Sequence, residues 1–362
     1  MTPSSLKKVV NAAFALIIIL LVVIGCRKNE IRINNILNGY QQVNLVSDTM
    51  GFGASIIDPS LVNAWGIAEA PSGPIWISSN GPGLSTIYDD NGVTLRQPVL
   101  IPSPDSTGGG TPSGVIFNAT TDFSFMSGES TVASKFIFAT EDGIIAAWGG
   151  GNNATKVVDN SAANAVYKGL AIANDGTGNF LYVTNFKQSR IDVFDNAFNP
   201  VSGKAFHDPG IFSDFGPFNI RNIGGLLYVT YAKHLTPDNH DDEAGPGNGF
   251  VDVYKPDGSW VKRLATRGAL NSPWGIAESS AGFNNVPFHV ILVGNFGDGR
   301  INVFDMEGGF HGQLEDHGHP ITIDGLWGID TNLPNTDSTR IYFTAGPDKE
   351  SHSLFGYLKK KD

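Results

Sequence analysis

Trp65-Gly66-Ile67 is the first of six similar triplets, and their spacing decides the fold that we predict for this 362-residue chain. Each triplet has an apolar or aromatic residue, then glycine, then a branched aliphatic residue. Two triplets have serine or lysine in the first place, and one has asparagine for glycine. The other five are Ser113-Gly114-Val115, Lys168-Gly169-Leu170, Phe218-Asn219-Ile220, Trp274-Gly275-Ile276 and Trp327-Gly328-Ile329.

The triplets recur at intervals of 48 to 56 residues, close to the 40 to 50 residues that one propeller blade uses. A run rich in β-branched and aromatic residues follows each triplet, and a third run follows that one, often before a turn signal. Fourth runs are weaker, as in residues 94–101 and 260–265. The pattern predicts an all-β chain, a six-bladed β-propeller with four strands in each blade.

The recurring glycine has a structural reason in such a fold. The innermost strands converge on the axis, and a residue without Cβ lets the backbone approach a neighbour closely or bend. The sixth unit reaches the chain end after its third strand, whereas residues 40–46 belong to no unit. We therefore expect residues 40–46 to pair as the outer strand of the last blade, which removes two open sheet edges. The alternative is that this segment extends a tether.

Composition narrows the classes of function. The net charge is −11 with no basic stripe, so nucleic acid is not expected as a partner. There is no G-x-S-x-G motif and no Gly-rich phosphate loop between a strand and a helix, so nucleophilic catalysis finds no support.

The N-terminus predicts export and lipidation. Lys7 and Lys8 precede an apolar run, residues 12–25, that has signal-peptide length and ends just before Cys26, the single cysteine. It resembles a bacterial lipobox, in which this cysteine is acylated after cleavage. The alternative is an uncleaved anchor helix. We predict a signal peptide at 1–25, lipidation at Cys26, a tether at 26–39 and a propeller at 40–362, held at a bacterial membrane in the cell envelope by its lipid.

Eight strings of the propeller are similar to those of a bacterial family of exported proteins without an established activity. They are NAWGIA (63–68), FIFATEDG (136–143), LYVTNF (181–186), LYVTYAK (227–233), GFVDVY (249–254), VGNFGDGRINVFD (293–305), IDGLWGI (323–329) and YFTAGPDKE (342–350). The resemblance covers residues 41–357. It implies a propeller similar in style to NHL-repeat and gluconolactonase-like proteins.

One face of the propeller is expected to gather polar and aromatic side chains around the channel mouth, the mixture that small-molecule and carbohydrate pockets use. Its alternative is that asparagine and aspartate only shape tight turns. The predicted mouth residues are Trp65, Asn80, Glu141, Asp142, Asn185, Tyr231, Lys233, Trp274, Asn295, Asp298, Trp327 and Asp348.

The similarity to gluconolactonase-like enzymes implies a divalent ion such as Ca²⁺ at the axis. Asn185 and Asn295 would supply amide oxygens, and Glu141 or Asp348 a carboxylate. The glutamate that those enzymes carry at the start of the first inner strand is absent here. Two other clusters are weighed as metal sites, against solvated loops: the acidic insertion at residues 233–248, and Asp316 to His319.

Two functions follow from the sequence. The first is a binding platform in which the mouth and the insertion bind a partner protein or a glycan. The second is a metal-dependent hydrolase of a small lactone or ester.

Overall fold

A computed structural model describes residues 37–279, 289–331 and 333–361. The predicted signal peptide, Cys26 and most of the predicted tether lie outside these residues. The described part contains no helix with the length and hydropathy needed to span a bilayer. Its one short 3₁₀ helix, η1, covers Ser161–Ala163.

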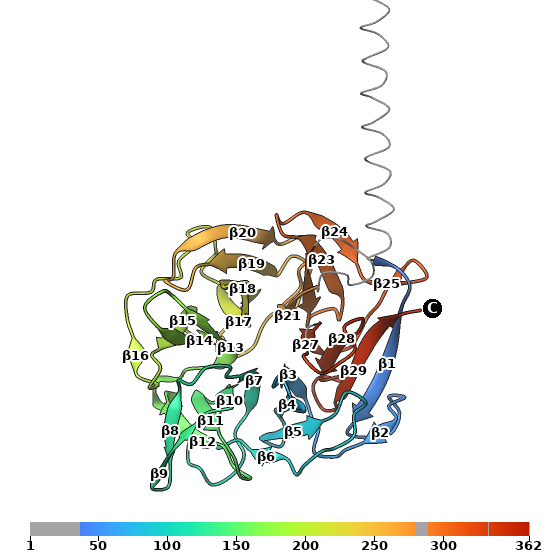
Figure 1. Cartoon of the computed structure of the whole chain (residues 1–362). Coiled ribbons are helices and arrows are strands. Elements are labelled where there is room, and N and C mark those ends of the chain that lie inside the picture. The colour runs from blue at the N-terminus through green and yellow to red at the C-terminus, as the bar shows by residue number, and fades with distance from the viewer. Residues whose placement is uncertain (1–36, 280–288, 332, 362) are drawn as a thin grey trace, which may run out of the picture.

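The strands form six antiparallel four-stranded blades around a central channel (Figure 1). Blades 1 to 3 consist of β3 (Ala64–Glu69), β4 (Ile75–Ser79), β5 (Leu84–Tyr88) and β6 (Val99–Leu100); β7 (Pro112–Phe117), β10 (Phe136–Thr140), β11 (Ile144–Trp148) and β12 (Thr155–Asp159); and β13 (Tyr167–Asn174), β14 (Asn179–Asn185), β15 (Arg190–Phe194) and β16 (Pro200–Val201).

Blades 4 to 6 complete the ring and confirm the predicted fold. They consist of β17 (Phe215–Ile223), β18 (Leu226–Lys233), β19 (Gly249–Tyr254) and β20 (Trp260–Thr266); β21 (Pro273–Glu278), β22 (Val290–Asn295), β23 (Ile301–Asp305) and β24 (Phe310–Gln313); and β27 (Leu326–Asp330), β28 (Ile341–Ala345), β29 (Leu354–Lys360) and β1 (Tyr40–Ser47).

Three short additions lie outside the blade pattern: β2 (Ile56–Ile57) pairs in parallel with β1, a hairpin of β8 (Ser124–Ser127) and β9 (Ser130–Ala133) interrupts blade 2, and β25 (Glu315–Asp316) pairs with β26 (His319–Pro320).

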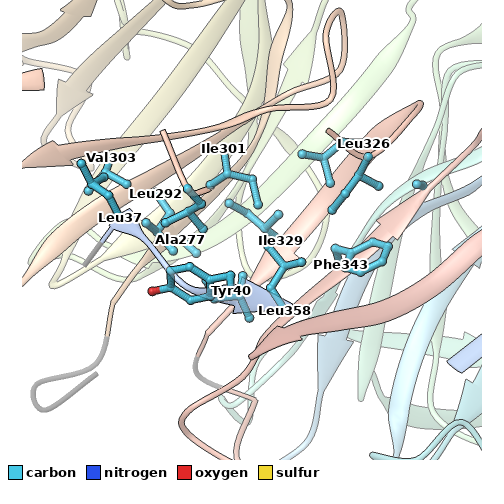
Figure 2. Close-up of a cluster of buried hydrophobic side chains, with 14 of the residues drawn as sticks. Leu37, Tyr40, Ala277, Leu292, Ile301, Val303, Leu326, Ile329, Phe343 and Leu358 are labelled. Carbon is cyan, nitrogen blue, oxygen red and sulfur yellow. The ribbon is translucent and has the colours of Figure 1, made fainter. Parts of the chain in front are cut away.

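The ring closes as predicted, because β1 pairs antiparallel with β29 along its whole length, from Tyr40 opposite Lys360 to Ser47 opposite Leu354. The closing strand also carries core side chains. Figure 2 shows Leu37 and Tyr40, which are 8% and 0% exposed, packed among aliphatic residues of blades 5 and 6 such as Leu292 and Leu358. Leu37, the first described residue, is therefore already part of the core, although it falls within the predicted tether.

Each recurring triplet marks an irregularity in its inner strand. The register between the first and second strands shifts at the triplet in all six blades, between Ala64 and Ile67 in blade 1 for example. At these points consecutive inner strands touch. A Cβ on Gly66 would lie 2.6 Å from Val115 N in blade 2, and one on Gly328 would lie 2.7 Å from Trp65 O, back in blade 1. We call this ring of contacts the waist of the channel. It explains the glycines: an added Cβ would clash with the next blade's backbone.

Asparagine replaces glycine in blade 4 and still takes part in the waist. The Asn219 side chain donates to Trp274 O in blade 5 at 2.7 Å and accepts from the Ile220 N–H at 2.8 Å. Its backbone in turn leaves no room for a Cβ on Gly169. The imperfect triplet therefore keeps the contact between blades by a hydrogen bond.

Candidate functional site

The start of every inner strand and the end of every second strand lie at the same end of the channel, which we call the mouth. Tyr167 pairs with Asn185 in blade 3, and Pro273 pairs with Asn295 in blade 5. The predicted mouth residues follow from this pairing, since they precede inner strands or follow second strands.

Six aromatic side chains fill the centre of the mouth, and we call them the aromatic plug: Trp65, Phe186, Phe218, Trp274, Phe296 and Trp327. The Trp327 ring stacks on Trp65 at a centroid distance of 3.6 Å and on Phe296 at 3.9 Å, and Trp274 meets Trp65 edge-on at 6.0 Å. The three tryptophans are between 1% and 4% exposed. The plug therefore places all three predicted tryptophans together as the floor of the mouth.

Lys168 stands on this floor and is buried. Its Nζ lies 5.0 Å from the centre of the Trp65 ring and 5.8 Å from that of Phe186. The ammonium pairs with the carboxylate of Glu141 and lies 3.5 Å from that of Asp241. Burial opposes the charge, but these carboxylates raise the pKa of Lys168, so it stays protonated.

A hydrogen-bonded network links Glu141 to the last blade. Asn80 Nδ2 donates to Glu141 Oε2 at 2.8 Å, and Asn63 Nδ2 donates to Asn80 Oδ1 at 3.4 Å and to Glu350 Oε1 at 3.3 Å. Asn63 Oδ1 also accepts from Trp327 Nε1 at 3.2 Å. Burial, with the nearby charge of Glu141, raises the pKa of Glu350 to about 7. One acid of the network therefore titrates near neutral pH.

The insertion of blade 4, residues 233–248, reaches over the mouth, and we call it the cap. Its two arms pair with each other: Glu243 N donates to Lys233 O and Leu235 N to Asp241 O, both at 2.8 Å. From its tip, Asp241 meets Lys168 and Asp238 meets Lys187 Nζ at 2.7 Å, both on blade 3.

The residues expected to bind a metal each hydrogen-bond to other neighbours. Asn185 Nδ2 donates to Gln188 and Asp192 of its own blade, and Asn295 Nδ2 donates to Ala269 O and Asp298. Asp348 lies in a loop where its backbone N–H donates to Asp324. The predicted set of Glu141, Asn185, Asn295 and Asp348 therefore stays a prediction.

A different group has metal-ligating atoms close together. Ligand atoms of Glu141, His240 and Asp241 lie within 4.8 Å of one another, the one such group among the described residues. His240 Nδ1 is 2.9 Å from Asp241 Oδ1, and this bond raises the pKa of His240 and lowers that of Asp241. Because Lys168 contacts two of the three, its ammonium already supplies positive charge there.

The other predicted mouth residues make local contacts. Asp142 accepts from the Thr140 hydroxyl, Tyr231 OH lies 3.0 Å from Tyr254 OH inside blade 4, and Lys233 pairs with Glu243 at 2.8 Å. Away from the mouth, Asp316 is paired with Lys361 at 2.7 Å, beside His317.

Sequence reasoning did not select Lys168 as a site residue, although a signal was present. Lys168 replaces the aromatic residue in the third triplet, at the position that carries Trp65, Trp274 and Trp327 in other blades. A lysine there points to the mouth. Glu350 follows the second strand of the last blade, so the sequence pattern places it at the mouth, but its contact with Asn63 depends on the loop after β28.

The opposite end of the channel is open and has a cavity of about 510 Å³. Its wall combines aliphatic and polar side chains and is crossed by Arg221, whose Nη2 donates to Asp330 Oδ2 at 2.5 Å. Nη1 donates to Ile276 O and Ile329 O, both at 3.4 Å. The cation of blade 4 thus ties blades 5 and 6 together across the channel.

The comparisons with known proteins found viral relatives. "Uncharacterized protein L690" of Acanthamoeba polyphaga mimivirus is 35% identical over 340 residues, 88% of this chain and 86% of that protein. "Uncharacterized protein R648" of the same virus is 35% identical over 322 residues, 85% of this chain and 77% of that protein. These relatives are viral, which corrects the bacterial family implied by the sequence resemblance. No family model matches the chain.

Solved propellers share the fold at low identity. An aldose sugar dehydrogenase from Escherichia coli has a TM-score of 0.53 at 12% identity, covering 89% of this chain and all of that one. A streptogramin B lyase has a TM-score of 0.52 at 12% identity, covering 89% of this chain and 97% of that one. These likenesses establish the six-bladed architecture.

Proposed function

The chain belongs to the same protein family as these two mimivirus proteins, and we propose that it is a binding protein whose ligand site is the capped mouth. One observation carries the proposal: polar and charged side chains from five blades converge over the aromatic plug. They are Asn80, Glu141, Lys168, Asp241 and Glu350, from blades 1, 2, 3, 4 and 6.

The electrostatics support a ligand better than a purely structural role. Three carboxyl groups surround one ammonium, and burying charge costs free energy that a well-packed apolar core avoids. Groups with shifted pKa values in a concave place are typical of functional sites. The pKa of Glu350, raised to about 7 by burial, fits this description.

The test compares the two ends of the channel. Lys168→Met with Glu141→Gln removes the charged pair at the mouth, and Arg221→Met with Asp330→Asn does the same at the open end. Replacing both partners of a pair by neutral groups of similar size leaves folding nearly unchanged. We expect compounds that raise the Tm of the wild-type protein, in a chemically diverse library, to lose their effect in the first double variant and keep it in the second. Loss in the second alone would contradict the proposal.

A metal-dependent hydrolase of a small lactone or ester is the second candidate. The observation that favours it is the proximity of Glu141, His240 and Asp241. Oxygen and imidazole ligands suit Ca²⁺ or Zn²⁺, and a bound metal would polarise a carbonyl and activate water. Added metal should then raise the Tm and support lactone hydrolysis, and Asp241→Asn should abolish both effects. Metal binding without turnover would leave only a binding site.

For the location, we propose that the mature protein is anchored to a membrane of the cell envelope through acylated Cys26. The support is the lipobox-like end of the apolar segment in the sequence. Cys26→Ser should abolish labelling by a fatty-acid probe in a bacterial host and release the protein from membranes. Labelling that persists in Cys26→Ser would refute the anchor.

A further inference from the structure

Buried polar atoms without a partner among the described residues are concentrated at the mouth. The indole N–H groups of Trp65 and Trp274 have no acceptor, and the side-chain oxygens of Asn295 and Asn239 have no donor. Trp327 offers the contrast, since its N–H donates to Asn63 Oδ1 at 3.2 Å. The fold thus satisfies one tryptophan of the plug and leaves two donors open.

Such groups are costly to bury. An unsatisfied buried donor or acceptor costs about 1 to 3 kcal/mol, and nearly all buried polar groups in folded proteins have partners. Trp65 and Trp274 are only 2% and 4% exposed, and their ring centres are 6.0 Å apart. Two buried indole donors in adjacent rings of the plug are therefore available to a hydrogen-bonding ligand.

The unpartnered donors and acceptors, taken together, indicate the chemistry of the ligand. A metal ion cannot accept a hydrogen bond from an indole N–H, and an anion would meet the carboxylates of Glu141, Asp241 and Glu350. A hydroxyl group both donates and accepts, so it satisfies the indole donors, the amide oxygens and the carboxylates alike. Apolar C–H faces would pack on the aromatic rings of the plug.

We infer that the mouth binds a neutral carbohydrate, whose hydroxyls accept from Trp65 and Trp274 and donate to the carboxylates around Lys168. This inference rests on the proposed function and names its ligand class.

For the ligand to enter the mouth, the tip of the cap must lift from blade 3. The ion pairs that hold the tip there, Lys168 with Asp241 and Lys187 with Asp238, have acids whose side chains are 61% and 70% exposed. The Lys187–Asp238 pair is exposed and contributes little stability, and the buried Lys168 ammonium keeps Glu141 as its partner when Asp241 leaves.

The test uses neutral mono- to trisaccharides of glucose, galactose, mannose and N-acetylglucosamine as probes on the wild-type protein. Binding is measured by the rise in Tm and by tryptophan fluorescence. Trp274→Phe removes one open donor and keeps an aromatic ring. Trp76→Phe is the matched control, because Trp76 also has an unpartnered buried N–H but packs on Phe136 and Trp148 between blades 1 and 2.

At least one probe should bind the wild-type protein and Trp76→Phe equally, with its Kd raised about five- to thirtyfold in Trp274→Phe, as expected for one lost hydrogen bond. If Trp274→Phe does not fold, Trp65→Phe serves the same purpose. Equal weakening by Trp76→Phe, or no binding by any saccharide, would overturn the inference. If other compounds still bind and depend on Lys168 and Glu141, the proposed function stands and only the ligand class fails.

Discussion

Each end of the channel has an ion pair between residues of two different blades, but the surroundings of the two pairs differ. At the mouth, Lys168 of blade 3 pairs with Glu141 of blade 2, and its side chain is 2% exposed among aromatic rings. At the open end, Arg221 of blade 4 pairs with Asp330 of blade 6, and its side chain is 33% exposed in a cavity. A cavity of about 510 Å³ thus lies at the open end, whereas the mouth gathers a buried ammonium, carboxylates and aromatic rings. Convergent side chains, rather than empty volume, distinguish the mouth as the candidate site.

The largest expected effect comes from removing one cation. Lys168→Met leaves the buried carboxylate of Glu141 without a cation and with only the Asn80 amide, among the described residues, as donor, so we expect the free energy of unfolding to fall by about 3 to 5 kcal/mol. Arg221→Met should cost less, about 1 to 2 kcal/mol, because water can reach Asp330 once the guanidinium is gone. Urea unfolding of both variants measures the difference. Equal losses would mean that the two ends are equally buried in solution.

A second experiment uses pH to compare acids at the two ends. Burial raises the pKa of Glu350 to about 7, above its ordinary value of 4.5. The folded protein then holds a proton that the unfolded chain has released, so the stability from this group is full below about pH 4.5 and is lost as the pH rises to about 7. Between these pH values the wild-type protein should lose about 2 to 3 kcal/mol relative to Glu350→Gln.

Glu69 at the open end provides the control. Burial also raises the pKa of Glu69, but the backbone N–H and the side chain of Asn335 donate to its carboxylate and work against the rise. Glu69→Gln should change the pH dependence in the same direction and by less. Stability curves measured across this range decide the point, and a Glu350→Gln curve parallel to the wild-type curve would contradict the raised pKa.

The fold could be predicted from sequence because its signals are local and repeated. The triplets mark the waist in all six blades, and the unassigned residues 40–46 indicated the closing strand. The meeting of Trp65, Trp274 and Trp327 follows from the same repeat, since equivalent positions of different blades face one axis. Geometry that repeats from blade to blade can be predicted from a single sequence.

The rest of the site depends on contacts that break the repeat. The cap leans from blade 4 onto blade 3, so no spacing in the sequence relates Asp241 to Lys168. Asn185 shows that residue type alone does not determine the partners of a side chain. Its amide suits a metal ligand by residue type, yet its oxygen accepts from the Val166 N–H at 3.4 Å and its N–H₂ group donates to Gln188 and Asp192. Residue type and position on a face do not determine which neighbour engages a side chain.

The waist separates the two ends, and a smaller effect tests it. Gly66→Ala would place a Cβ 2.6 Å from Val115 N and 2.7 Å from Ser113 O, both backbone atoms that cannot turn away. We expect a loss of about 1 to 3 kcal/mol, as for other overpacked positions. Gly178→Ala is the control, because its Cβ would meet only Phe180 Cε2 at 4.0 Å. Thermal unfolding compares them, and equal Tm values would show that neighbouring inner strands are not in contact.

The smallest expected effect on stability comes from the tip of the cap. This experiment also tests whether the cap controls ligand entry at the mouth. Asp238→Asn breaks the pair with Lys187, but the Asp238 side chain is 70% exposed, so stability should change by less than about 1 kcal/mol. Asp337→Asn is a matched control, since Asp337 is 47% exposed and lies 3.6 Å from Arg340, away from the cap. If the cap must lift to admit a ligand, Asp238→Asn should speed ligand association in stopped-flow fluorescence and Asp337→Asn should not. An unchanged association rate in Asp238→Asn, with ligand still bound at the mouth, would mean that the tip does not limit entry.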